Sequence, residues 1–315
     1  MLYLILFLFS FVLTYVVREY AIKKAIMDIP NERSSHTIPT PRGGGIAIIV
    51  TFFLGLFIFK DAVSKELFYA LLSALPIVVV SLIDDIHPLS SKIRLFFQAL
   101  SAILVLYFLG GVNHIDFIWF QLSGWWLNIL VFVSIIWLTN LYNFLDGIDG
   151  YAGSQALTIG LGMFLIFSNP IGGVLGVASL GFLVFNWHKA SIFMGDVGSA
   201  TLGFIVAVLA FSDTSNGNIY FWLIGLSLFW YDATLTLFRR YRNGEKIMEA
   251  HRKHAYQRLV QSNWTHQEVT IGLVFFNLTF LVVLFFTSHW ELVFIVNMVS
   301  LWVLVKYIDQ KKDFK

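Results

Sequence analysis

Long apolar runs alternate with short polar segments along the whole chain. Eleven runs approach or reach the roughly 17 to 20 apolar residues that a helix needs to cross the hydrocarbon core of a bilayer. The runs occupy residues 1–17, 43–59, 67–83, 95–110, 125–141, 151–168, 171–187, 198–212, 219–238, 270–287 and 290–306. Because backbone groups in lipid must be hydrogen-bonded within their own segment, each run predicts a helix. The pattern predicts an all-α polytopic integral membrane protein with about eleven transmembrane helices, in one domain over residues 1–315.

Composition supports a membrane protein and excludes some kinds of active-site chemistry. The chain is 58% hydrophobic and 13% charged, with 32 Phe and 10 Trp, and a soluble protein of this size could not bury that much apolar surface. It has no cysteine, which excludes disulfides and thiolate chemistry. No basic residue precedes the first run, and the first positive charge is Arg18. We therefore expect this run to be a retained span and not a signal peptide.

Positive charge divides the connecting segments into two sets. One set carries only Lys60 and Lys65, which leaves 19 of the 21 Lys and Arg residues for the other. The richer set consists of residues 18–42, 84–94, 142–150, 188–197, 239–269 and the tail from 307, with Lys306 counted in the tail. The positive-inside rule places that set in the cytoplasm, which predicts an external N-terminus and a cytoplasmic C-terminus. In this membrane setting the basic stretch near 239–258 does not indicate nucleic-acid binding.

The richest polar island is residues 140–150, which read N-L-Y-N-F-L-D-G-I-D-G. Asn140, Asn143, Asp146 and Asp149 recur every three residues, and such neighbours share a slowly winding stripe on a continuous helix. Gly147 and Gly150 predict that the helix ends here, which leaves the carboxylates in a loop. Amide and carboxylate oxygens are ligands that Mg²⁺ prefers.

Three further acids lie at span boundaries in the same set of segments. Asp84 and Asp85 are adjacent at the end of an apolar run, followed by Lys92 and Arg94. Adjacent carboxylates repel, so we expect a divalent ion or a lysine beside them, with a charged helix cap as the alternative. Asp196, in the run F-M-G-D-V-G-S, is either another metal ligand or the N-cap of the next helix.

Other features of the sequence indicate a phosphate-binding site. Three glycines at 43–45 open the second run, where helix amides and the helix dipole attract anions, and Arg33, His36 and Arg42 could pair with phosphate. The alternative is a turn with ordinary positive-inside charge. Asp232 lies inside the ninth run, where an acid needs a partner or a polar cavity. The basic segment 239–269 is either a contact with anionic lipid headgroups or a lid over a polyanionic substrate.

Together, acids with amides and basic loops with glycines indicate metal-assisted phosphoryl transfer on the cytoplasmic side. The membrane setting favours a lipid as one substrate and a soluble, nucleotide-like phosphate compound as the other. An ion-coupled transporter or lipid flippase is the rival interpretation. Transporters place their sites near the midplane between repeated halves, whereas here the acids cluster at one face and no repeat is visible.

The motifs resemble those of the polyprenyl-phosphate N-acetylhexosamine 1-phosphate transferases, over nearly the whole chain. The resemblance rests on Asp84-Asp85 at a span exit, on N-x-x-N-x-x-D-G-x-D-G at 140–150 and on F-M-G-D-x-G-S at 193–199. It implies transfer of a sugar 1-phosphate from a UDP-sugar to undecaprenyl phosphate, with release of UMP, in a bacterial inner (plasma) membrane. The active site would face the cytoplasm.

The resemblance also implies roles for individual residues. Asp196 would bind Mg²⁺, with Mn²⁺ as the alternative ion, helped by Asn143. Asp84 and Asp85 would be catalytic beside the lipid phosphate, either as a base or as a covalent nucleophile; we favour direct attack by the lipid phosphate, which is already largely ionised. The expected nucleotide- and substrate-binding residues are Asp146, Asp149, Asn140, His36, Arg42, Thr40, His254, Arg252 and Asp232.

One departure from the family pattern bears on the donor sugar. Relatives that use UDP-N-acetylglucosamine often carry H-x-H-H in the last large loop, and here His254-Ala255-Tyr256-Gln257 stands in its place. This segment and the first loop look more like the branch that begins O-antigen with 6-deoxy amino sugars. We therefore expect a UDP-N-acetyl amino sugar as donor and a role in lipopolysaccharide or cell-wall biosynthesis. Oligomeric state stays open between a monomer and a homodimer.

Overall fold

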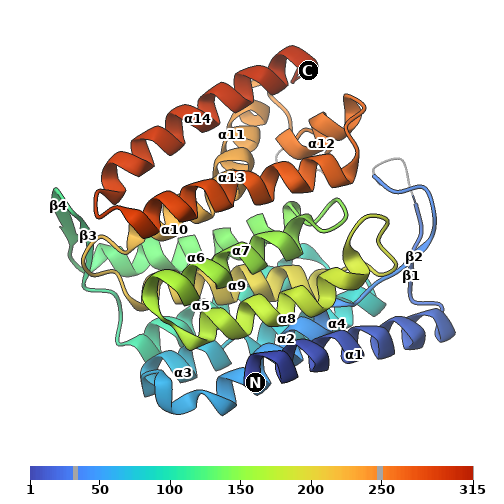
Figure 1. Ribbon diagram of the computed structural model, residues 1–315, viewed down its shortest axis with the longest axis horizontal. Coiled ribbons are helices and arrows are strands. Elements are labelled where there is room, and N and C mark those ends of the chain that lie inside the picture. Colours follow the sequence, from blue (N-terminus) through green and yellow to red (C-terminus); the bar gives the residue numbers. More distant parts are fainter. Residues whose placement is uncertain (31–34, 247–250, 315) are drawn as a thin grey trace.

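The structure is a computed structural model that describes residues 1–30, 35–246 and 251–314, and it is built almost entirely of helices (Figure 1). The helices are α1 Leu2–Lys23, α2 Gly45–Ile58, α3 Lys65–Leu72, α4 Leu75–Ile86, α5 Ser91–Leu109, α6 Trp126–Phe144, α7 Tyr151–Phe167, α8 Pro170–Asn186, α9 Asp196–Ser212, α10 Ile219–Gly225, α11 Ser227–Arg242, α12 Ala255–Gln261, α13 His266–Phe286 and α14 Trp290–Lys311. Two short antiparallel hairpins, which the sequence did not predict, pair β1 Met27–Asp28 with β2 Thr40–Pro41, and β3 His114–Phe117 with β4 Phe120–Ser123.

Every predicted apolar run is helical, although runs 67–83 and 219–238 are each divided between two helices, α3 with α4 and α10 with α11. An all-α polytopic membrane protein is therefore confirmed. Among the described residues, six helical segments are long and apolar enough to cross a membrane, with α3 and α4 counted together, and α10 with α11 makes a seventh if that pair, bent by 68°, is one span. Four further apolar helices, α2, α7, α8 and α9, are shorter. The number of eleven crossings and the orientation of the termini stay predictions.

Several boundaries differ from the predicted ones in ways that matter for the polar residues. α4 continues to Ile86, so Asp84 and Asp85 lie in its last turn and not in a loop. α5 begins at Ser91, four residues earlier than the apolar run, because the Ser90 side chain accepts a hydrogen bond from the Ile93 backbone N–H and caps the helix. Its first turn therefore includes Arg94.

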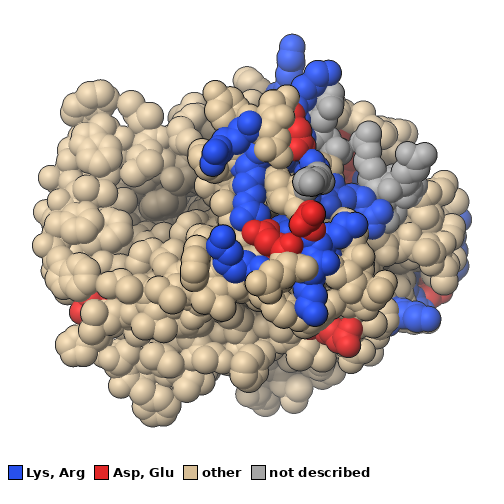
Figure 2. Space-filling model, turned by 90° about the horizontal axis from the view of Figure 1, so that it is seen from above, with Lys and Arg blue, Asp and Glu red and all other residues tan. Residues whose placement is uncertain are grey.

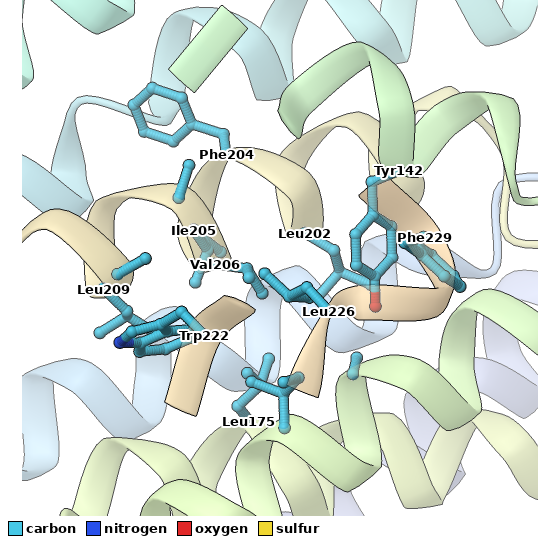
Figure 3. Packing of buried hydrophobic residues seen from close by; sticks show 14 of the residues in the cluster. Tyr142, Leu175, Leu202, Phe204, Ile205, Val206, Leu209, Trp222, Leu226 and Phe229 are labelled. Atoms are coloured by element: carbon cyan, nitrogen blue, oxygen red, sulfur yellow. The ribbon is translucent and has the colours of Figure 1, made fainter. Parts of the chain in front are cut away.

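α9 is the central helix of the bundle. Its residues from Val197 to Ala210 are all buried, and Figure 3 shows Leu202, Val206 and Leu209 packed among side chains of α6, α10 and α11. Close packing of the helices depends on glycine: a Cβ on Gly160 of α7 would lie 2.5 Å from the backbone nitrogen of Gly176 on α8. Small residues of this kind let membrane helices approach closely.

The polar ends of these helices meet at one end of the bundle. The connections around residues 145–150 and 187–195, the β1–β2 hairpin and α12 lie together toward the right of Figure 1. Seen from above in Figure 2, Lys and Arg side chains gather over the same half, whereas the other half is almost free of charge. The fold therefore brings the predicted cytoplasmic segments into one region.

Candidate active site

A cavity of about 270 Å³ opens among these segments. Its walls come from the β1–β2 segment, the ends of α4 and α6, the 145–150 and 187–195 connections, α12 and the start of α13. The lining residues are Asp28, Ser35, His36, Arg42, Asp85, Asn143, Asp146, Gly147, Ile148, Asp149, Asn186, Phe193, Met194, Gly195, Asp196, Gln257 and His266. Seven of the predicted site residues are thus brought together: His36, Arg42, Asp85, Asn143, Asp146, Asp149 and Asp196.

Asp85, in the last turn of α4, caps the N-terminus of α9. Its carboxylate accepts hydrogen bonds from the backbone N–H groups of Asp196 at 3.0 Å and Val197 at 3.1 Å, and from Arg42 Nη2 at 2.9 Å. The first amides of a helix have no partner within the helix, and an acid placed there satisfies them and complements the helix dipole. The N-cap position of α9 is Gly195, so Asp196 does not cap its own helix. Its side chain remains available to the cavity.

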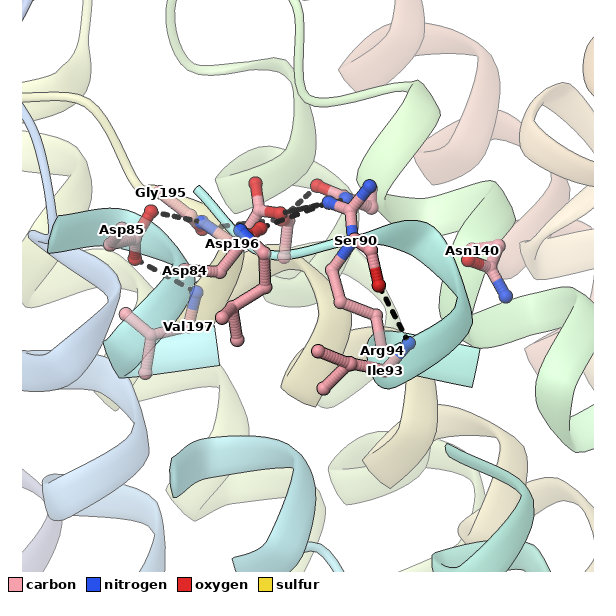
Figure 4. Close-up of polar contacts among 12 residues, drawn as sticks. Asp84, Asp85, Ser90, Ile93, Arg94, Asn140, Gly195, Asp196 and Val197 are labelled. Carbon is pink, nitrogen blue, oxygen red and sulfur yellow. Dashed lines mark hydrogen bonds and ion pairs between the residues drawn. The ribbon is translucent and has the colours of Figure 1, made fainter. Parts of the chain in front are cut away.

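Arg94 connects Asp84 to Asp196, as Figure 4 shows. Its Nη1 atom lies 3.0 Å from Asp84 Oδ2 and 2.9 Å from Asp196 Oδ2. Asp84 Oδ1 also accepts a hydrogen bond of 2.5 Å from the backbone N–H of Leu89. Asp84 does not line the cavity and reaches it through this arginine. The sequence showed Arg94 only as a basic neighbour, because its partner Asp196 is 102 positions away.

The Asn143 amide is held between two residues of α9. Its Nδ2 atom lies 3.4 Å from Asp196 Oδ2, and its Oδ1 atom accepts a hydrogen bond of 2.7 Å from the Ser199 hydroxyl. In this orientation the amide presents its nitrogen to Asp196. A metal ion shared with Asp196 would require the flipped amide, which the Ser199 hydroxyl can also satisfy because it both donates and accepts.

Asp146 is the acid in most need of a cation. Among the described residues, none donates a hydrogen bond to its carboxylate, which faces the cavity. Burial and the neighbouring carboxylates of Asp196, Asp85 and Asp149 raise the pKa of Asp146 to about 8. An excess of carboxylate oxygens with one acid unpartnered fits the donor set of a hard divalent cation.

Asp149 is braced by two histidines that the sequence did not single out as partners. Its Oδ2 atom lies 3.0 Å from His188 Nδ1 and 3.4 Å from His266 Nδ1, and it accepts a hydrogen bond from the Ala190 backbone N–H at 3.3 Å. Burial acts to raise the pKa of Asp149, but the hydrogen bond and charge of His266, with the hydrogen bonds of His188 and the Ala190 backbone, outweigh it and lower the pKa. The ligand atoms of the three side chains lie within 4.8 Å of one another and are of types that could hold a transition-metal ion.

Two predicted residues are placed where they support the fold next to the cavity. The Asn140 amide exchanges hydrogen bonds with Gln98 of α5, at 2.7 and 3.3 Å, and neither lines the cavity. Thr40 is buried in β2, and its hydroxyl donates to the carbonyl oxygen of Ile38. The Asn140 contact joins α6 to α5, whereas the Thr40 contact is local to its own segment.

Asp232 and His254 belong to the anchorage of α12. Both carboxylate oxygens of Asp232 accept the backbone N–H of Ala255, at 2.8 and 2.9 Å, and His254 is the N-cap residue of α12. Asp232, Arg252 and His254 do not line the cavity, whereas Gln257 of the same helix does. The partner of the buried Asp232 carboxylate is thus the backbone N–H at the start of α12.

The glycine run at the start of α2 packs tightly against the 193–198 segment. The amides of Gly44 and Gly45 donate to the carbonyl oxygens of Phe193 and Met194, at 2.9 and 2.8 Å. These two amides are therefore not available to an anion. His36 and Arg42 from the same segment do line the cavity, and Arg33 lies outside the described residues.

Comparison with known proteins gives a consistent result. The model of glycosyl transferase family 4 matches residues 67–213. A probable undecaprenyl-phosphate N-acetylglucosaminyl 1-phosphate transferase of Bacillus subtilis (strain 168) is 29% identical over 275 residues, covering 81% of this chain and 75% of the relative. A decaprenyl-phosphate N-acetylglucosaminephosphotransferase of Mycobacterium tuberculosis (strain CDC 1551 / Oshkosh) is 30% identical, covering 81% and 74%. An undecaprenyl-phosphate alpha-N-acetylglucosaminyl 1-phosphate transferase of Yersinia pestis is 26% identical, covering 84% and 78%.

Proposed function

Because this chain belongs to glycosyl transferase family 4, we propose that it transfers a sugar 1-phosphate from a UDP-N-acetyl amino sugar to undecaprenyl phosphate. The observation that carries the proposal is the convergence of Asp85, Asp146, Asp149 and Asp196 with Arg42 on one cavity. Acids that hold a divalent ion and cations that bind phosphate are the parts that phosphoryl transfer needs. The relatives named above are transferases of this type, which supports the same reaction.

The proposed reaction is a direct displacement at phosphorus. An oxygen of the lipid phosphate attacks the sugar-bearing phosphorus of the UDP-sugar, and the bond from that phosphorus to the bridging oxygen breaks. UMP leaves with the electron pair, and a diphosphate joins the sugar to the lipid. The attacking monoester is already largely ionised at neutral pH. The bond between the anomeric carbon and oxygen stays intact, so the sugar keeps its anomeric configuration.

A divalent ion, Mg²⁺ or Mn²⁺, fits the donor set described above and would be held by Asp196 together with Asn143. When bound, it would offset the negative charge of the diphosphate. Arg42 and His36 would contact phosphate, and Asp146 and Asp149 would lie near the nucleotide. Asp84 and Asp85 would have different roles. Asp85, which bonds the start of α9, would position Asp196, whereas Asp84 would orient the acceptor.

We further infer that the enzyme works from the cytoplasmic face of a bacterial inner membrane and begins a surface polysaccharide such as O-antigen. The excess of Lys and Arg at the cavity end supports this orientation. For the donor, H-A-Y-Q at 254–257 supports a 6-deoxy amino sugar. Full-length protein in detergent with Mg²⁺, undecaprenyl phosphate and a panel of UDP-sugars tests the donor, and preferred turnover of UDP-N-acetylglucosamine would overturn this part of the proposal.

Metal-dependent release of UMP tests the reaction itself. We expect UMP only when undecaprenyl phosphate and a divalent ion are both present, which neither a transporter nor a lipid phosphatase would produce. Asp196→Asn should lower the rate by at least about 100-fold, the scale of losing one main electrostatic group in an active site. Its thermal unfolding should stay close to that of the wild type, because Asp85 bonds the backbone of residue 196 and the Asn side chain keeps an oxygen that can accept from Arg94. Wild-type activity in this variant would remove Asp196 from the metal site.

A further inference from the structure

Arg94 places one nitrogen between two acids of the site. The same Nη1 atom contacts Asp84 Oδ2 at 3.0 Å and Asp196 Oδ2 at 2.9 Å. The second of these oxygens belongs to the residue assigned above to the divalent ion, and Asn143 Nδ2 also faces it. A guanidinium keeps its charge at every physiological pH. A fixed positive charge therefore stands at an oxygen that a divalent ion would also bind.

The surroundings of the pair show which group can move. Asp84 and Asp196 are anchored: Asp84 by the Leu89 backbone N–H, and the start of α9 by Asp85. The Arg94 side chain, in contrast, is 35% exposed, and among the described residues it is held only by the two carboxylates. When a cation binds Asp196, the guanidinium is the partner free to leave, because it can swing toward solvent or cavity without unfolding a helix end.

We propose that Arg94 is an internal cation that competes with the divalent ion for Asp196 and, once displaced, binds substrate phosphate. The inference rests on the proposed function for the identity of the site. Guanidinium groups pair with phosphate as readily as with carboxylate. Metal and phosphate binding are then linked through one side chain: the ion releases Arg94 for phosphate, and phosphate, by holding Arg94, leaves Asp196 to the ion. Such coupling must be reciprocal.

Manganese binding without substrate tests the competition. Electron paramagnetic resonance of Mn²⁺ with purified protein in detergent gives the Kd for wild type, Arg94→Ala, Arg94→Lys and Lys92→Ala. We expect Arg94→Ala to bind Mn²⁺ about tenfold more tightly than wild type, within the usual range of coupling between two ligands. Arg94→Lys should fall between them. Lys92 lies two residues away, is exposed and forms no ion pair within the described part of the chain. Lys92→Ala therefore controls for the loss of one nearby charge and should change the Kd less than about twofold.

Unchanged or weaker binding in Arg94→Ala would overturn the competition, as would an equal gain in Lys92→Ala. Methylguanidinium provides a second measurement that does not depend on comparing folds. Added to Arg94→Ala, it should weaken Mn²⁺ binding toward the wild-type value, whereas the same concentration of ethylammonium should have a smaller effect. Equal effects of the two cations would count against a site shaped for guanidinium.

Farnesyl phosphate, a short acceptor analogue, tests the phosphate half. It should tighten Mn²⁺ binding to the wild type by a larger factor than to Arg94→Ala, because only the wild type has an arginine to transfer. Equal factors would overturn the phosphate role. These titrations need no turnover, so their outcome is separate from the UMP-release assay: competition without UMP release would refute the proposed function and leave only the competition between Arg94 and the divalent ion standing.

Discussion

At the scale of single residues, the acids of this site differ in what surrounds them. Asp85 is saturated by backbone amides and Arg42, and Asp149 by two histidines and an amide. Asp146 has neither, although it lies in the same cavity. Residues that look equivalent in the sequence therefore divide into structural anchors and groups free to meet a ligand.

The raised pKa of Asp146 predicts how stability depends on pH. With a pKa raised from its usual 3.8 to about 8, the folded protein binds a proton between those values that the unfolded chain does not. Stability without divalent ions should therefore fall as pH rises from about 4 to about 8. Between pH 5.5 and 8.5, the Tm of the wild type should fall more than that of Asp146→Asn, measured by differential scanning fluorimetry in detergent with EDTA.

Comparing the Tm profiles of the wild type and Asp146→Asn separates the contribution of Asp146 from that of other titrating groups. Mg²⁺ added at pH 8.5 should raise the Tm of the wild type more than that of Asp146→Asn, because the ion offsets the crowded carboxylates. Parallel pH profiles of the two proteins would show that this carboxyl is not the one that titrates.

At the scale of elements, the site depends on how closely helix ends approach each other. The start of α2 lies directly against the start of α9, and a Cβ on Gly45 would come within 2.3 Å of Gly198 Cα and 2.9 Å of the Met194 carbonyl oxygen. Both obstacles are backbone and cannot swing aside. Glycine at 45 thus lets the segment that carries Asp196 reach its place.

Gly45→Ala should therefore damage both stability and activity. We expect a cost of about 1–3 kcal/mol for the overpacked contact, seen as a lower Tm, together with loss of UMP release as the 193–198 segment shifts. Gly272→Ala is the matched control, because no heavy atom outside its own helix turn lies within 4 Å of the added Cβ. It should keep the wild-type Tm and rate, and a Gly45→Ala protein equal to it would contradict the contact.

At the scale of the whole molecule, Lys and Arg side chains gather over the half of the bundle that holds the polar helix ends, and the other half of the same view shows almost none (Figure 2). The β3–β4 hairpin belongs to the lysine- and arginine-poor set of connections, and the turn between α4 and α5 belongs to the rich set. The two should therefore lie on opposite sides of the membrane.

Cysteine labelling tests this orientation directly, because the natural chain has no cysteine. Ser123→Cys and Ser91→Cys exchange exposed serines at the two ends. A membrane-impermeant maleimide should label Ser123→Cys in intact cells (spheroplasts where an outer membrane is present), and Ser91→Cys only after permeabilisation. The reverse pattern would place the cavity outside and refute the cytoplasmic site.

The sequence by itself determined the helical membrane architecture and the common end for the acids. Apolar runs must become helices in lipid, and charge asymmetry sorts their connections, so both follow from local composition. Its motifs also located seven residues of the cavity wall. These properties do not depend on the angles at which helices cross.

Only the tertiary structure decided what each polar residue contacts. Asp85 caps α9, Asp232 caps α12, Asn140 joins Gln98, and Arg94 bridges Asp84 to Asp196. Each pairing joins different helices, and a hydrogen bond requires atoms to be aligned within a few tenths of an ångström. Spacing along one helix cannot supply that alignment, because it depends on how the helices pack against one another.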